Sequence, residues 1–162
     1  MSNAVARSRD LPRKVRRLIS LDGPRRALLI EAVLALALAR LVLLIVPFPR
    51  LARRLGACVG PDDRRVLEAK APGGPARVAL ARDIGWAVVS AGRHVPLKAE
   101  CLAEAVAART MLARRGAPSV LHLGAAKGGG KAFDAHAWLI SAGVEVTGFP
   151  VARGFVAVAC FV

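Results

Sequence analysis

A chain of 162 residues, 55% of them hydrophobic, is long enough to bury a core of its own, and this composition excludes wholesale disorder. Its formal net charge is +14, of which residues 1–66 carry +9 (14 Lys and Arg against 5 Asp and Glu) and residues 67–162 carry +5 (11 against 6). Such a charge attracts anionic lipid, acidic peptides or nucleic acid, although a coding bias that uses Arg as the solubilising residue would explain it equally well. Nucleic acid is not expected as a partner, because aromatic residues make up only 4% and no recognition motif occurs.

The N-terminal part predicts a long apolar helix. Residues 1–4 have the composition of a cloning remnant and are left out of the fold prediction. After a basic stretch, residues 27–46 are rich in Leu, Ala, Val and Ile and are broken only by Glu31 and Arg40. The length would allow a membrane span, but each charge near the middle costs roughly 2.5–3.5 kcal/mol on insertion, so we expect a buried or interfacial helix. Basic flanks on both sides suit contact with anionic lipid, which would place a cytoplasmic protein at the inner membrane face.

The rest of the chain predicts helices first and strands afterwards. Helical periodicity and breaker residues indicate helices over 51–57, 76–91 and 100–115, with a further helical turn from Pro61. After Pro118 the period changes to that of strands, over 119–125, 133–141, 144–147 and 155–161, with a turn at 142–143. This order predicts an α+β fold with an antiparallel sheet. We expect residues 1–57 to form a basic, apolar helical region that packs as one unit with a domain over 58–162.

Cys101 and His136 are the candidate catalytic residues. Cys101 opens the predicted 100–115 helix, where the helix N-terminus favours a thiolate, and His136 lies on a strand 35 residues later. A nearby imidazole can take the thiol proton and then give it to a leaving group. The alternative for Cys101 is a small buried hydrophobic residue, and for His136 a half-buried strand residue.

The other cysteines and histidines offer weaker chemistry. Cys58 and Cys160 are interpreted as structural, and the three cysteines together form neither a zinc spacing nor a disulfide framework, which fits a reducing cytoplasm. A metal site made of Cys101, His122 and His136 is conceivable but has no diagnostic spacing, so no metal or cofactor is expected. His94 precedes a proline and is interpreted as a surface loop residue.

The glycine-rich segment 127–131 does not match a phosphate-binding loop. The motif requires Gly at 125 and Ser or Thr at 132, and both positions hold Ala. The segment also precedes a predicted strand, whereas the motif opens a helix. A hairpin connection is the better interpretation.

Several short segments together resemble the lasso peptide biosynthesis B2 proteins, which are leader peptidases with a transglutaminase-like cysteine protease fold. The resemblance is close over about residues 76–150, and its most specific pair is Cys101-Leu102 with Ala135-His136-Ala137-Trp138. The apolar helix ending in Pro47-Phe48-Pro49-Arg50 is also similar to members of that family. The remaining matches are Trp86-Ala87-Val88, Val95-Pro96, Ala99-Glu100, Arg114-Arg115-Gly116 and Leu121-His122-Leu123-Gly124.

The resemblance implies hydrolysis of one amide bond in a ribosomally made precursor. Cys101 would attack the carbonyl between leader and core, and His136 would act as general base and then as acid. It also implies three partners: the precursor leader peptide, a separate B1 recognition protein and a lasso macrocyclase. The B1 protein is expected to be separate because residues 1–75 show no run of strands that would form a fused recognition domain. A basic surface would help to dock an acidic leader or the B1 protein.

One position departs from the family pattern. The family often places an Asp about twelve residues after the His, and here that residue is Gly148. Asp134, which alternation places on the same strand face as His136, is the best candidate carboxylate to orient the imidazole. A backbone carbonyl, Thr147 or water are the alternatives. The departure also leaves open a non-catalytic adaptor on the same fold, or an inactive relative.

Overall fold

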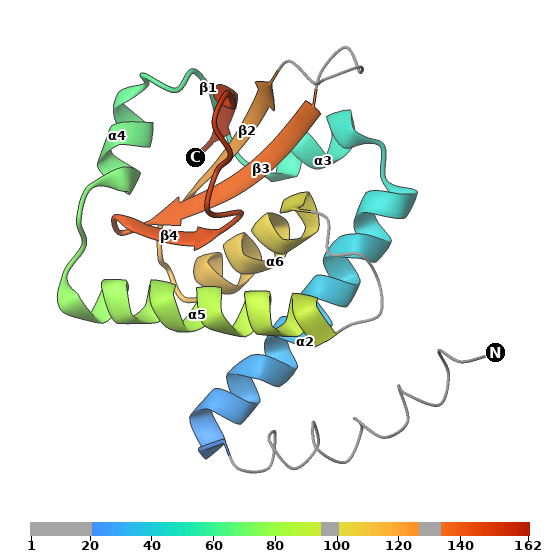
Figure 1. The fold of residues 1–162 in the computed structure, drawn as a ribbon, viewed down its shortest axis with the longest axis vertical. Helices are drawn as coiled ribbons and strands as arrows, with labels where there is room; N and C mark the ends of the chain where they lie inside the picture. Colours follow the sequence, from blue (N-terminus) through green and yellow to red (C-terminus); the bar gives the residue numbers. More distant parts are fainter. Residues whose placement is uncertain (1–20, 95–100, 127–133) are drawn as a thin grey trace.

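A computed structural model describes residues 21–94, 101–126 and 134–162 (Figure 1). The predicted basic stretch before residue 21 and the 127–131 segment lie outside these described residues. The bounds of the elements, with the labels of Figure 1, are α2 (Gly23–Ile45), α3 (Phe48–Arg54), β1 (Cys58–Val59), α4 (Arg64–Lys70), α5 (Pro75–His94), α6 (Cys101–Ala113), β2 (Val120–Ala126), β3 (Asp134–Ser141), β4 (Val144–Thr147) and β5 (Val156–Phe161).

The strands form one antiparallel sheet in the order β1-β5-β2-β3-β4. The α+β prediction is therefore confirmed. Strands β3 and β4 form a hairpin through Ala142 (φ 52°) and Gly143 (φ 75°). A two-residue hairpin turn of this kind needs positive φ at both positions, which explains the short connection.

The two faces of the sheet have different coverings. Leu121, Leu139 and Phe161 are aligned across β2, β3 and β5, and they join the main core with α2, α5 and α6. The next residues along these strands, His122, Trp138 and Cys160, are aligned on the opposite face. There Val66 of α4 packs against Cys160 in a smaller cluster, so α4 covers part of this second face (Figure 1).

Helix α6 lies at the centre of the main core, packed against α2, α5 and the sheet (Figure 1). It has almost no polar face. Its buried residues are Ala103, Ala105, Val106, Ala107, Ala108, Met111 and Leu112. The many alanines let the neighbouring backbones approach closely, and alanine also has the highest helix propensity. A helix that is apolar nearly all round belongs inside a domain, which is where α6 lies.

Helix α2 directs both of its interior charges towards the protein. Glu31 accepts hydrogen bonds from Arg115 at 2.6 and 3.0 Å, and these hydrogen bonds lower the pKa of Glu31. Arg40 of α2 is buried, and its positive charge acts on Glu104 of α6. Burial raises the pKa of Glu104, and the positive charges of Arg40 and Arg93 oppose this effect. The helix therefore packs as part of the domain core.

The described residues differ from the predicted elements in four main places. Helix α4 covers Arg64–Lys70, whereas one helical turn from Pro61 was expected. Helix α3 begins at Phe48, earlier than expected, because Pro47 and Pro49 fall at the cap and first turn, where proline is tolerated. The two-residue strand β1 was not predicted. His94 was expected in a loop but is the last residue of α5.

Candidate active site

The sulfur of Cys101 contacts the backbone of the strand that carries His136. Cys101 is the first residue of α6, and its Sγ accepts a hydrogen bond from the amide N–H of Ala137 at 3.4 Å. That amide nitrogen is bonded directly to the carbonyl carbon of His136. The thiol therefore touches the same peptide unit from which the imidazole side chain extends. The contact joins the start of α6 to the backbone of β3 next to His136.

The Ala137 amide is available because the β3–β4 ladder ends before it. The last paired residues on that side are Leu139 and Thr147. Beyond them β4 leaves the sheet, and the edge of β3 would otherwise present an unpaired N–H group. The sulfur at the start of α6 takes that position. An N–H donor together with a helix N-terminus stabilises negative charge on a sulfur placed there.

The imidazole of His136 is held by a backbone carbonyl. Its Nε2 lies 2.7 Å from the carbonyl oxygen of Gly148, the first residue after β4. A carbonyl oxygen only accepts hydrogen bonds, so Nε2 carries the proton and the lone pair of the neutral ring is on Nδ1. The ring is half-buried. Gly148 thus selects the tautomer in which Nδ1 can act as a base.

Only glycine allows this approach at position 148. Gly148 has φ +81°, and a Cβ there would meet the carbonyl oxygen of Ala137 and lie 2.8 Å from the Cα of Trp138. Both the positive φ and the lack of space exclude a side chain. The position where the family pattern has a carboxylate therefore supplies a main-chain oxygen instead.

Asp134 does not take the role proposed for it from the sequence. It lies at the exposed start of β3, two residues before His136, and Nε2 of the ring is already engaged by Gly148. Strand alternation places Asp134 and His136 on one face, as predicted, but two residues along a strand are about 6.6 Å apart. The backbone carbonyl, one of the alternatives left open by the sequence, is the observed partner.

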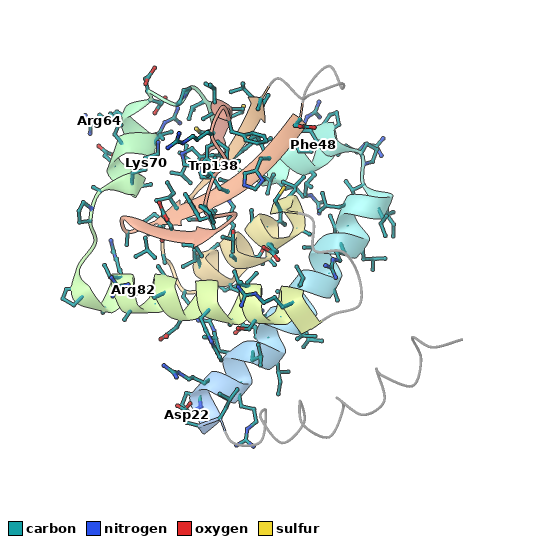
Figure 2. All side chains as sticks on the ribbon, viewed as in Figure 1. Asp22, Phe48, Arg64, Lys70, Arg82 and Trp138 are labelled. Carbon is teal, nitrogen blue, oxygen red and sulfur yellow. The ribbon has the colours of Figure 1, made fainter. Side chains whose placement is uncertain are left out.

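Aromatic rings surround the imidazole. His136 stacks on Trp138 with a centroid distance of 6.0 Å and contacts Phe155 in a tilted arrangement at 5.4 Å. Trp138, labelled in Figure 2, is buried, and its ring lies over Gly124, where a Cβ would meet Trp138 Cζ3 at 2.5 Å. The glycine of the Leu-His-Leu-Gly segment therefore makes room for the indole ring.

His122 contacts the same tryptophan from β2. The two rings stack at 5.3 Å with an angle of 5° between their planes. His122 is 1% exposed, and burial, assisted by the charge of Lys70, lowers its pKa to about 4. This histidine is neutral at physiological pH. Among the described residues no group of three His, Cys, Asp or Glu side chains gathers as a metal site.

The other two cysteines lie in different surroundings. Cys160 is buried between α4 and the sheet, and burial raises the pKa of its thiol. Cys58 is exposed on β1, so it is not a core residue. Cys160 lies opposite His122 in the sheet, and Cys101 is the thiol that bonds to the peptide unit next to His136.

The arrangement places a thiol, an imidazole of defined tautomer and backbone N–H groups around one strand edge. In the part of the chain that the structure describes, the thiol's hydrogen bond goes to the Ala137 amide and none joins Sγ to the imidazole. Alternation places the His136 ring on the face of β3 that carries Trp138, whereas α6 packs on the face that carries Leu139. Catalytic hydrogen bonds commonly tighten when substrate binds.

The fold is an α+β domain with a cysteine at the start of a helix and a histidine on a strand of the antiparallel sheet. The profile of the Transglutaminase-like superfamily matches residues 42–159, and this chain belongs to that superfamily. Its members commonly have cysteine protease or transferase activity. No match was found among curated proteins or among solved structures.

The sequence did not identify two contributors to the site. Phe155 was only the expected first residue of a strand, and no local pattern connects it to His136. The sequence allowed an unspecified backbone carbonyl as the partner of His136. It could not single out that of Gly148, because the distance from this carbonyl to the imidazole depends on where β4 ends. A glycine at the family's acidic position was the one available signal.

Proposed function

We propose that this chain is a cysteine peptidase that removes the leader from a ribosomally synthesised lasso peptide precursor, acting with a separate B1 recognition protein. The observation that carries the proposal is the contact of Cys101 Sγ with the peptide unit of His136, together with the tautomer that Gly148 selects. Membership of the Transglutaminase-like superfamily supports the thiol chemistry. The leader-peptide substrate and the B1 partner rest on the resemblance of the Cys-Leu and Ala-His-Ala-Trp segments.

In the proposed mechanism, Cys101 Sγ attacks the scissile carbonyl carbon while Nδ1 of His136 takes the thiol proton. The C–N bond then breaks, and His136 returns that proton to the leaving amine of the core peptide. Water, deprotonated by the same nitrogen, hydrolyses the thioester to release the leader as a carboxylic acid and to regenerate the thiol. The Gly148 carbonyl stabilises the imidazolium formed between the steps, because it accepts from Nε2–H in both states. Backbone N–H groups at the start of α6 would stabilise the tetrahedral oxyanion.

The released amine explains the expected macrocyclase partner. Cleavage leaves a free N-terminus on the core peptide, and a macrocyclase would use that amine to close the ring. The basic protein surface would favour an acidic leader, and such steering weakens as salt rises.

The decisive experiment follows cleavage of a candidate lasso precursor by mass spectrometry, in the presence of a separate B1 recognition protein. Cys101→Ala should abolish cleavage, whereas Cys58→Ala, which removes an exposed thiol on β1, should leave it unchanged. Cleavage by Cys101→Ala at the rate of the unmodified protein would end the proposal.

A second candidate is a non-catalytic adaptor that binds leader or partner on the same fold. Two observations favour it: Gly148 replaces an acid, and Cys101 Sγ bonds to an amide instead of to the imidazole. Iodoacetamide labelling separates the two functions. A peptidase should be alkylated at Cys101 faster than at the more exposed Cys58, and His136→Ala should remove that advantage. An adaptor should show no dependence of Cys101 labelling on His136.

A further inference from the structure

Helix α2 carries an uninterrupted apolar stripe on the side away from the protein. The exposed residues recur at helical spacing, and several are highly exposed, including Leu34 (65%), Leu44 (85%) and Ile45 (69%). Figure 2 shows α2 running between Asp22 and Phe48 along the side of the domain. The large residues of this stripe are Ile30, Val33, Leu34, Leu38, Leu41, Leu44, Ile45 and Phe48.

The stripe is free of charge because both interior charges of α2 point the other way. Glu31 is paired with Arg115, and Arg40 is buried towards α6. A helix of a monomeric soluble domain normally places its polar residues outward and its apolar residues inward. Here the outward face from Ala27 to Phe48 has no polar side chain. An exposed apolar surface of this extent marks an interaction site.

Positive charge flanks the stripe at both ends. Arg25 and Arg26 lie at the start of α2, and Arg50, Arg53 and Arg54 lie on α3 just beyond it. Glu31 is the one acidic residue between positions 23 and 54, and it faces inward. With 23 residues, α2 is about 35 Å long, so the two arginine groups bracket the whole apolar surface.

We propose that this stripe, which we call the α2 apolar face, docks parallel to an anionic lipid surface. The leucines would enter the boundary between headgroups and acyl chains, and the flanking arginines would contact lipid phosphates. This surface role goes beyond the proposed peptidase activity and does not depend on it. The total charge of +14 adds long-range attraction in the same direction.

Two other arrangements fit the structure less well. The length and hydropathy of α2 would allow it to cross a membrane, but its opposite side is built into the core through Ala32, Leu36 and Ala39. Spanning would require extracting these residues together with Arg40. A second copy packed on the same stripe, in either direction, would place arginines against arginines at both ends, which is unfavourable.

The test is flotation of the full chain with vesicles of phosphatidylglycerol and phosphatidylcholine in equal parts, compared with phosphatidylcholine alone. We expect binding to the anionic vesicles to be strong at about 0.1 M salt and weak at about 1 M, where the Debye length falls from about 10 to about 3 Å. Replacing Arg50, Arg53 and Arg54 by Gln should reduce the preference for anionic vesicles by about fivefold per arginine.

Matched double variants test the apolar contribution. Leu34→Gln with Leu38→Gln alters the α2 apolar face, and Leu67→Gln with Val158→Gln alters similarly exposed apolar residues on α4 and β5. The first pair should weaken vesicle binding by at least about tenfold, and the second should leave it unchanged. Thermal melts should be unaffected in both, because the replaced side chains are exposed.

Three results would overturn the proposal. The first is failure of the full chain to float with anionic vesicles at low salt. The second is equal loss of binding in the two double variants. The third is a dimer in light scattering that the α2 pair dissociates while vesicle binding stays unchanged, which would assign the stripe to a second copy.

Discussion

His122 and His136 lie on neighbouring strands and contact the same indole ring, but their surroundings give them different properties. His122 is almost fully buried, and neither of its ring nitrogens has a hydrogen-bond partner among the described residues. His136 is half-buried, bonds to the Gly148 carbonyl and lies beside the peptide unit that the Cys101 sulfur contacts. Two histidines of the same chemistry, about 5–6 Å from one tryptophan, are thus separated into a packing residue and a candidate base.

The difference teaches that the end of a strand can create a site. His122 is paired on both sides, with Trp138 of β3 and Cys160 of β5, although the β2–β5 register shifts just beyond it, between Leu123 and Gly124. His136 lies where the β3–β4 ladder stops, so a carbonyl and an amide are free to contact side chains. Backbone groups left unpaired by the sheet must find other partners, and here those partners are the imidazole and the thiol.

The largest expected effect separates the two histidines by rate. His136→Ala should slow precursor cleavage by about 10²–10⁴-fold, the range that a general base contributes. His122→Phe, which keeps an aromatic ring stacked on Trp138, should retain most of the activity. Single-turnover cleavage followed by mass spectrometry measures both variants. Equal losses in the two would show that the indole contact, and not the base, governs activity.

The next effect separates them by pH. The pKa of His122 is lowered from 6.5 to about 4, so between these values the unfolded chain binds a proton that the folded chain does not. Stability should be unaffected by this group above pH 6.5 and should fall by about 3 kcal/mol as pH decreases through the window to 4. Urea unfolding at a series of pH values measures it. His122→Phe should lose this component and His136→Ala should keep it; the reverse pattern would contradict the assignment.

A third substitution tests the carbonyl that orients His136. Gly148→Ala should destabilise the fold by more than the roughly 1–3 kcal/mol that positive φ alone costs, because the added Cβ also meets the backbone of β3. It should also slow cleavage by at least about tenfold and change the pH dependence of Cys101 alkylation. Gly116→Ala is the matched control, since Gly116 has φ +65° with open space around it. If alkylation changes alike in both variants, Gly148 has no orienting role.

The smallest effect concerns the ring on the other side of the imidazole. Phe155→Leu keeps an apolar side chain but removes the tilted contact with His136, which should cost about 0.5–1.5 kcal/mol and slow cleavage only a few-fold. Denaturant unfolding and cleavage assays measure the two quantities. The pH window of His122 should not move, and a shift there would mean that the two histidines are coupled through Trp138.

The sequence predicted the elements whose signals are local. The β4 strand over 144–147 and the turn before it are as expected, because alternation and an Ala-Gly pair are read within a few residues. Strand β1 was not predicted because a strand of two residues shows no periodicity. Its partners, Cys160 and Phe161 on β5, lie about 100 residues later in the sequence. Such a strand exists only through its partner.

The residues of the candidate site also fall into those that the sequence could indicate and those that depend on the fold. Cys101 and His136 could be proposed from residue type and from the element that carries each. Their meeting at one peptide unit depends on where α6 lies against β3. The choice of Gly148 over Asp134 depends on where β4 ends, which alternation along β3 does not encode. Sequence patterns indicate the candidate reacting groups, and tertiary packing determines which groups they contact.

The alanine content of α6 has a consequence for how this protein can vary. From Cys101 to Arg109 no residue of the helix is exposed, and its small side chains occupy the space between two other helices and the sheet. An added methyl group in this helix must therefore be accommodated by displacement of α2, α5 or the sheet. The packing of α6 and the position of the Cys101 sulfur at its first residue therefore depend on the same neighbouring elements.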